Sequence, residues 1–359
     1  MSVSKRIFQL LAGLSVFALV FVSIACNNGG GEPGTKSVSL TGAGATFPNP
    51  LYQKWLSEYS KLHPNVKIDY QSIGSGGGIK QIKEQTVDFG ASDAPMKDEE
   101  LKSAPGEILH IPTVLGAVVI TYNLTGISKP LQFSPDVIAD IYLGKIKKWN
   151  DPKITADNPG VTLPAADITV VHRSEGSGTS AVFTDYLSKV SAEWKEKVGA
   201  GASPSWPVGI GGKGNEGVTG QVKQTPNTIG YVELAYAVQN NLPAAHIKNV
   251  SGNFIEASID SVIAAAADSA TSTPEDLRVS ITNAPGAKSY PISSYTYLLV
   301  YKNQKDAGKG KALVDFVWWG IHDGEGFAKE LRYAPLPEDI VKRAEAKIKS
   351  VTANGTALR

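Results

Sequence analysis

One pattern that recurs along this chain is first seen in the stretch Val38-Ser39-Leu40-Thr41-Gly42-Ala43-Gly44-Ala45-Thr46-Phe47-Pro48. Its apolar start predicts a short strand, and its glycines predict a tight turn. The residues that follow recur at the spacing of one helix face: Leu51, Trp55, Tyr59 and Leu62. The stretch therefore predicts a strand, a polar turn and a helix, in that order.

The same alternation continues along the chain. Further strands are expected at Val66–Tyr70, Val87–Ala91, Leu115–Tyr122, Ile168–Val171, Ile229–Val232 and Tyr295–Tyr301. Helices are expected after the glycines of 74–78, around 182–187, and from Leu313 to Leu331, whose aromatic residues we interpret as core. Alternating strands and helices are typical of an α/β fold with mostly parallel sheets.

The size and charge of the chain narrow the function classes. At about 100–200 residues per domain, 359 residues predict about two domains. The 35 basic and 34 acidic residues nearly balance, which argues against a nucleic-acid partner. A small anion remains possible, because a local cluster of donors binds it without a large net charge.

The N-terminus has the pattern of an export signal. Lys5 and Arg6 precede an apolar run, 7–24, and a small residue follows. This order predicts a signal peptide over residues 1–25 and an extracytoplasmic location. The alternative is an uncleaved membrane anchor, since the run is close to the roughly 17–25 residues that span a bilayer.

The single cysteine lies directly after this signal. Cys26 resembles the acceptor of bacterial lipoproteins, which predicts a lipid anchor to the membrane, although Ser23 stands where such proteins usually have leucine. The alternative is a secreted protein with an incidental thiol. Gly, Asn, Pro and Ser together dominate residues 26–37, and this composition predicts a flexible tether.

Three polar turns that each open a helix are the candidate binding elements. They lie at Thr46-Phe47, at Ser75-Gly76 and at Ser177-Gly178-Thr179. A helix N-terminus has unsatisfied N–H donors and a partial positive charge, and hydroxyl groups add further donors. Each turn alone could be a simple helix cap, but three that converge would hold an anion.

Two charged residues sharpen this interpretation. Arg173 precedes the third turn and could bind two oxygens of a tetrahedral anion. Asp93 ends a predicted strand, where ligand sites of α/β proteins form. Its carboxylate would accept the proton that phosphate carries near neutral pH and would repel sulfate, which has none. A surface ion pair and a helix cap are the alternatives for these two residues.

Several motifs resemble the phosphate-binding proteins of bacterial phosphate-specific ABC transporters. In chain order they are 41–48 (TGAGATFP), 88–95 (DFGASDAP), 140–146 (DIYLGKI), 176–180 (GSGTS), 211–215 (GGKGN) and 229–233 (IGYVE). With the later segment 333–337 (YAPLP) they span nearly the whole chain after the tether.

The resemblance implies a two-lobed periplasmic-binding-protein fold of type II, with lobe I at 38–114 and 290–359 and lobe II at 115–289. It implies high-affinity binding of inorganic phosphate between the lobes, delivery to ABC permease subunits, a monomer, and neither cofactor nor metal. The implied phosphate ligands are Thr46, Phe47, Ser75, Asp93, Arg173, Ser177, Gly178 and Thr179.

One residue departs from the family pattern, and several functions besides phosphate binding stay open. Glu175 stands where the family has aspartate as the ion-pair partner of Arg173. An enzyme is disfavoured, because the chain has no Gly-x-Ser-x-Gly, no phosphate loop and no His-Glu-x-x-His. A binding protein for sulfate or molybdate and a structural lipoprotein of the cell surface also stay open.

Overall fold

The central sheet is parallel at its two sides and antiparallel in its middle. The computed structural model describes residues 37–359, and in this part of the chain eight strands lie in the order β2-β1-β3-β11-β4-β8-β6-β7. Their bounds are β2 Val66–Ser72, β1 Val38–Gly44, β3 Phe89–Ser92, β11 Ser293–Tyr301, β4 Ile108–Asn123, β8 Thr228–Glu233, β6 Thr169–Arg173 and β7 Ile210–Gly212.

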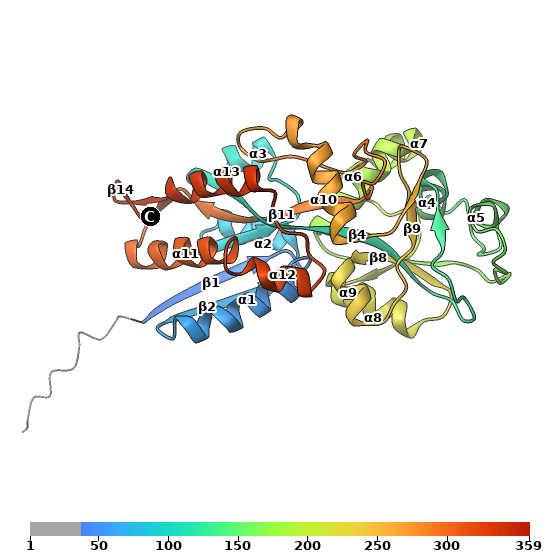
Figure 1. Ribbon diagram of the computed structural model, residues 1–359, viewed down its shortest axis with the longest axis horizontal. Coiled ribbons are helices and arrows are strands. Elements are labelled where there is room, and N and C mark those ends of the chain that lie inside the picture. Colours follow the sequence, from blue (N-terminus) through green and yellow to red (C-terminus); the bar gives the residue numbers. More distant parts are fainter. Residues whose placement is uncertain (1–36) are drawn as a thin grey trace, which may run out of the picture. The chain divides into compact units, whose positions relative to one another are not determined.

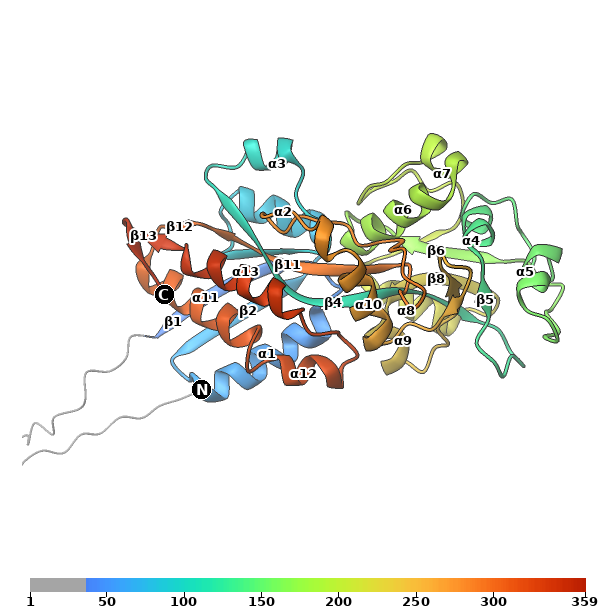
Figure 2. The ribbon, with the colours of Figure 1, turned by 45° about the horizontal axis from the view of Figure 1, so that its top comes forward.

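Strand β4 joins two lobes. From Ile108 to Ala117 it pairs antiparallel with β11, and from Val118 to Asn123 it pairs antiparallel with β8. Figure 2 shows β4 and β11 running between the two groups of elements. The first lobe contains the parallel strands β1, β2 and β3, and the second contains the parallel strands β6, β7 and β8. The expected parallel pairing thus holds within each lobe, and the crossing strands are antiparallel.

Helices cover the sheet in both lobes (Figure 1). Those around the first lobe are α1 Asn49–Leu62, α2 Ser75–Lys83, α3 Asp98–Lys102, α11 Ala307–Gly320, α12 Glu325–Glu330 and α13 Glu338–Lys349. Those around the second lobe are α4 Pro135–Tyr142, α5 Pro152–Asp157, α6 Gly178–Val190, α7 Ala192–Lys197, α8 Gly214–Gln224 and α9 Leu234–Gln239. Helix α10 Ile259–Asp268, followed by the 3-10 turn η1 Ala270–Ser272, packs on β4 and β11.

Two small sheets complete the fold of residues 37–359. One has the order β10-β9-β5, with β10 Phe254–Ile255, β9 His246–Lys248 and β5 Gln132–Phe133. The other has the order β12-β13-β14, with β12 Asn303–Gln304, β13 Thr352–Ala353 and β14 Thr356–Ala357.

The apolar patterns of the sequence correspond to the buried faces. Helix α1 buries Leu51, Trp55 and Tyr59, three of the four residues used to predict it, and leaves Leu62 exposed. Strand β4 is buried from its start to Tyr122, which explains its continuous apolar run. It begins seven residues before the predicted strand, because polar His110 and Thr113 are also enclosed.

One predicted helix is wrong. The expected continuous helix from Leu313 to Leu331 is divided into α11 and α12 by a turn at 321–324. The indole ring of Trp55 packs against this turn, and its Nε1 donates a 2.8 Å hydrogen bond to the carbonyl of Gly324. The apolar spacing continues across the turn because both helices face the same core: Trp319 of α11 packs against Phe327 of α12, with ring centroids 6.3 Å apart, and Ala328 of α12 is buried.

The predicted signal peptide at 1–25, the lipid acceptor Cys26 and nearly all of the tether at 26–37 lie outside the described residues. Between Ser37 and Arg359, none of the helices has the length and apolar character needed to cross a membrane. In the same range, the structure contains no group of three or more His, Cys, Asp or Glu side chains arranged to hold a metal ion.

Candidate functional site

The first lobe contributes three predicted residues to one buried spot. Thr46 follows β1, Ser75 opens α2 and Asp93 follows β3, so all three lie at the carboxyl end of the parallel strands or just beyond it. Each side chain is at most 2% exposed. The hydroxyl oxygen of Ser75 accepts a 3.2 Å hydrogen bond from the backbone N–H of Asp93, which fixes these two turns to each other.

Phe47 continues the Thr46 turn into α1. Its ring is fully buried, and its carbonyl oxygen accepts a 2.6 Å hydrogen bond from the hydroxyl of Tyr333. This bond links the segment after α12 to the entrance of α1. It holds the backbone of the turn in place beside Thr46.

The second lobe contributes the remaining predicted residues. Arg173 ends β6 and is 2% exposed, and the turn after it leads into α6. Ser177 caps this helix by accepting a 3.0 Å hydrogen bond from the N–H of Ser180. Gly178 and Thr179 form the first turn of α6, so their backbone donors have no partners within the helix.

The two sets of turns meet. A Cβ atom added to Gly178 would lie 2.2 Å from the hydroxyl oxygen of Ser75 and 2.5 Å from Oδ2 of Asp93. Close by, the N–H of Gly76 in α2 donates a 2.9 Å hydrogen bond to the carbonyl of Gly176. Only a residue without a side chain fits at Gly178, and the structure thus brings the three predicted turns together between the lobes.

Asp93 is an unusual carboxyl group for an anion site. Its Oδ1 accepts a 2.9 Å hydrogen bond from Thr296 in β11, while Oδ2 is buried without a hydrogen-bond partner. Burial raises the pKa of this carboxyl to about 7, and the opposing effects of the Thr296 bond and of Arg173 are smaller. The group therefore changes charge close to neutral pH, and one of its oxygens is available to a proton donor.

Arg173 pairs with the residue that departs from the family pattern. Its Nε donates a 2.9 Å hydrogen bond to Oε1 of Glu175, and its Nη2 binds the same oxygen. The N–H of Gly214 also donates to that oxygen, at 3.0 Å, whereas Oε2 is buried without a partner. The longer side chain thus uses a single oxygen, so the pair lacks the two parallel bonds of a bidentate arrangement.

The third nitrogen of the Arg173 guanidinium, Nη1, makes a different contact. It donates a 3.1 Å hydrogen bond to the hydroxyl oxygen of Thr179. Because Glu175 balances the charge of Arg173, an anion here would be held mainly by N–H and O–H dipoles.

Sequence reasoning missed three residues that the fold adds. Asn215 in α8 donates hydrogen bonds to both Thr46 and Thr179, and Thr296 binds Asp93. Buried Tyr236 in α9 donates a 2.6 Å hydrogen bond to the carbonyl of Thr46. The available signal was the glycine-rich motif at 211–215, since it precedes a helix in the same way as the three predicted turns.

The site adjoins two hollows that extend away from it. One of about 210 Å³ is lined by Asp93, Pro95 and Ser294, among others. Another of about 540 Å³ is lined by Ser75, Gly178 and the loop 200–205. The site is therefore buried between the lobes and borders both hollows.

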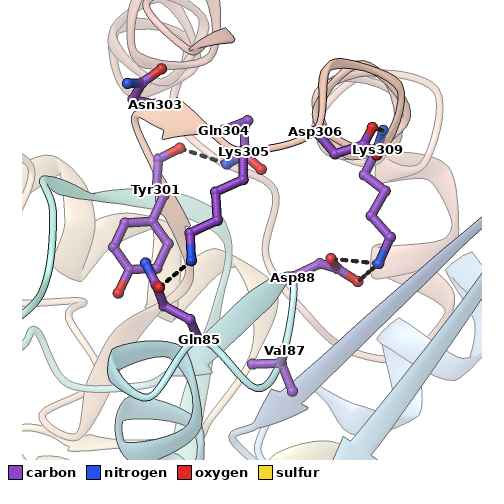
Figure 3. Close-up of a pocket in the computed structure, with 9 residues that line it drawn as sticks. All are labelled: Gln85, Val87, Asp88, Tyr301, Asn303, Gln304, Lys305, Asp306 and Lys309. Atoms are coloured by element: carbon purple, nitrogen blue, oxygen red, sulfur yellow. Dashed lines mark hydrogen bonds and ion pairs between the residues drawn. The ribbon is translucent and has the colours of Figure 1, made fainter. Parts of the chain in front are cut away.

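A separate cavity of about 140 Å³ lies in the first lobe beside α11 and β12 (Figure 3). Its main charges are paired with each other: Lys309 donates to both oxygens of Asp88, at 2.9 and 3.2 Å, and Thr41 donates to the same carboxylate. Lys305 binds Gln85 across the cavity. These contacts tie α11 to the sheet, and we interpret this cavity as structural.

Comparison with known proteins identifies the family. The model of the PBP superfamily domain matches residues 30–318. The phosphate-binding protein PstS of Xylella fastidiosa is 48% identical over 313 residues, which cover 87% of this chain and 85% of the relative. PstS of Methanocaldococcus jannaschii is 41% identical, with 94% of each chain covered. The chain belongs to the PstS family of the PBP superfamily.

Solved structures agree with the family on the fold. A phosphate-binding protein from Stenotrophomonas maltophilia has a TM-score of 0.66 at 22% identity, and the match covers 86% of this chain and 93% of that one. A periplasmic phosphate-binding protein, PfluDING, solved with bound phosphate, has a TM-score of 0.67 over the same shares of the two chains, also at 22% identity. These likenesses establish the two-lobed α/β architecture.

Proposed function

We propose that this protein binds one inorganic phosphate ion between its lobes and delivers it to the permease subunits of an ABC importer. It acts as a monomer and catalyses no reaction. Phosphate-binding relatives of similar length, at 41–48% identity, support the ligand and the transport role.

The observation that carries the proposal is the arrangement around Asp93. Donors dominate the site: the first turn of α6, hydroxyl groups from both lobes and a guanidinium group. Among them, Oδ2 of Asp93 is a buried acceptor without a partner. An unpaired buried acceptor costs about 1–3 kcal/mol, more when it is charged. Phosphate supplies the missing donor, because it carries a proton at neutral pH, and sulfate does not.

The proposed ligands come from the turns of both lobes. They are the side chains of Thr46, Ser75, Asp93, Arg173, Ser177 and Thr179 and the backbone N–H groups of Phe47 and Gly178. We place lobe I at 38–114 and 290–359 and lobe II at 115–289. The change of partner within β4, after Ala117, lies close to the proposed boundary.

The N-terminal assignment rests on the sequence pattern. We propose that residues 1–25 are removed on export, that Cys26 then carries a lipid, and that 27–37 is a tether outside the cytoplasm. Mass spectrometry of the N-terminal peptide tests this, because a free Cys26 thiol or an uncleaved N-terminus would contradict the lipid anchor.

Calorimetric titration of the full chain, stripped of bound anion and solubilised in mild detergent, tests the ligand. We expect tight 1:1 binding of phosphate, and much weaker binding of sulfate and molybdate that fades in alkaline solution, where Asp93 is ionised. Equal binding of sulfate would contradict the role of Asp93. No binding heat with any of these anions would favour a structural lipoprotein. Turnover of a generic phosphate ester would indicate an enzyme.

A further inference from the structure

The amide of Asn215 hydrogen-bonds to the hydroxyl groups of two proposed phosphate ligands, Thr46 and Thr179. It lies in the first turn of α8, is fully buried, and bonds to groups from both lobes. Its Nδ2 donates to the hydroxyl oxygen of Thr46, at 2.8 Å, and to that of Thr179, at 3.1 Å. Its Oδ1 accepts a 2.9 Å hydrogen bond from the backbone N–H of Glu233.

The contact with Glu233 decides which way the amide of Asn215 points. A backbone N–H can only donate, so the atom that faces it must be the oxygen. The NH2 group is then forced toward the two threonine hydroxyls. The orientation of this side chain is therefore set by the end of β8.

Both threonine hydroxyls have their acceptor capacity filled. The oxygen of Thr46 receives the backbone N–H of Asn215, at 3.1 Å, in addition to Nδ2. The oxygen of Thr179 receives Nη1 of Arg173, at 3.1 Å, in addition to Nδ2. A hydroxyl has two acceptor lone pairs and one proton. With two donors already bound, each of these hydroxyls is left with its proton as the only group to offer.

We propose that Asn215 is a positioning residue for anion selectivity, which fixes the Thr46 and Thr179 hydroxyls as donors toward the ligand and joins the two lobes around it. This inference deepens the proposed function and rests on it. A free hydroxyl can turn to donate or to accept, and it can satisfy either kind of ligand group. A hydroxyl held as a donor serves only an acceptor oxygen, and it leaves Asp93 as the place for the phosphate proton.

The contact with Thr46 also crosses between the lobes. Thr46 follows β1 in the first lobe, whereas Asn215 belongs to α8 in the second. The bonds to Thr46 from the backbone N–H and from Nδ2 of Asn215 can form only when the lobes are together. A substitution of Asn215 removes the Nδ2 bond and keeps the backbone bond. Loss of the Nδ2 bond should act mainly on the rate at which phosphate leaves, since the open protein still admits the ion.

The test compares Asn215→Ala with a matched control, an asparagine at the end of β4 that hydrogen-bonds to the same helix. Asn123 supports the other end of α8, where its amide donates to the carbonyls of Val222 and Lys223, at 2.9 and 3.1 Å. We expect Asn215→Ala in the full chain to bind phosphate roughly 10- to 100-fold more weakly, mostly through faster dissociation. Asn123→Ala should lose thermal stability and keep wild-type affinity.

A double-mutant cycle separates positioning from simple support of the fold. Thr46→Val and Thr179→Val remove both hydroxyls and keep the shape of the side chains. If Asn215 acts through these groups, Asn215→Ala should cause a much smaller further loss of affinity in the double-valine background. An equal loss in both backgrounds, wild-type affinity in Asn215→Ala, or the same loss in Asn123→Ala would each overturn the proposal.

A second variant covers the case in which Asn215→Ala does not fold. Asn215→Asp keeps the size of the side chain and the acceptor oxygen for the N–H of Glu233. Its ionised carboxylate would accept hydrogen bonds from the two threonine hydroxyls, which then could not donate to phosphate. Burial disfavours the charged form of the new carboxyl and raises its pKa, so phosphate affinity relative to wild type should recover as the pH is lowered and this carboxyl gains a proton. A pH-independent ratio would contradict the proposal. Failure of the wild type to bind phosphate would instead refute the proposed function itself.

Discussion

The substitution Asp93→Asn keeps the size of the side chain and replaces its free acceptor oxygen with an amide group that can donate. Hydrogen bonds to charged groups contribute roughly 1.5–3 kcal/mol, and about 1.4 kcal/mol is a factor of ten in affinity. We therefore expect phosphate to bind roughly 10- to 150-fold more weakly, because its proton loses its acceptor. Sulfate should bind more tightly, since it no longer faces a carboxylate.

The pH dependence of sulfate binding to the wild type gives a second measure of the same group. Burial raises the pKa of Asp93 to about 7, so the carboxyl is protonated below this pH and ionised above it. Only the protonated form can donate to sulfate. From about pH 9 to about pH 5 the protonated fraction rises from about 1% to about 99%, so sulfate affinity should increase roughly 100-fold. Asp93→Asn should abolish this dependence.

Isothermal titration of each anion at the two pH extremes and at neutrality measures both effects. Asp88→Asn is the control, because Asp88 lies just before the same strand but pairs with Lys309 in the first lobe, outside the proposed site. It should change stability and leave the ratio of phosphate to sulfate affinity as it was. An unchanged ratio in Asp93→Asn, or pH-independent sulfate binding to the wild type, would refute the proton-acceptor role.

Three further substitutions test the packing, the ion pair and a buried acid. Gly178→Ala should prevent phosphate binding in calorimetry, because its Cβ would lie 2.2 Å from a hydroxyl of the other lobe. The control Gly220→Ala, whose Cβ meets nothing within 4 Å, should bind phosphate normally and gain about 0.5–1 kcal/mol of stability. Arg173→Met should weaken phosphate binding by roughly 2–5 kcal/mol and lower the melting temperature. Adding Glu175→Gln to this variant should restore the melting temperature and leave the binding weak. Wild-type affinity in Arg173→Met would show that this residue is not part of the site. Burial raises the pKa of Glu233 well above its ordinary 4.5, so the folded protein keeps a proton that the unfolded chain releases, and stability is lost as the pH rises above 4.5. Glu233→Gln should therefore melt at a higher temperature than wild type in alkaline solution and at the same temperature near pH 4. A constant difference in melting temperature across this pH range would count against this.

Most of the strands and helices around the site, and the residues of its three turns, could be predicted from the sequence. The strands and helices around the site follow from apolar spacing, as in the run from Val38 to Leu62, because one buried face is enough to specify each element. The glycine and hydroxyl residues of the three turns were also visible, since a tight turn into a helix requires such residues at fixed neighbouring positions. The helix expected at 313–331 failed because the packing of Trp55 against its middle comes from a distant segment.

The tertiary structure decided how these turns are completed. Thr296, which binds Asp93, is 203 residues away along the chain, and Asn215 is 169 residues from Thr46. No spacing rule connects residues so far apart, because their meeting depends on the order of strands in the sheet and on the change of partner within β4. The raised pKa of Asp93 has the same origin, since burial by both lobes, rather than any neighbour in sequence, is its main cause. The sequence by itself determined which groups can bind an anion, and only the folded chain determined which of them donate, which accept and how they are held.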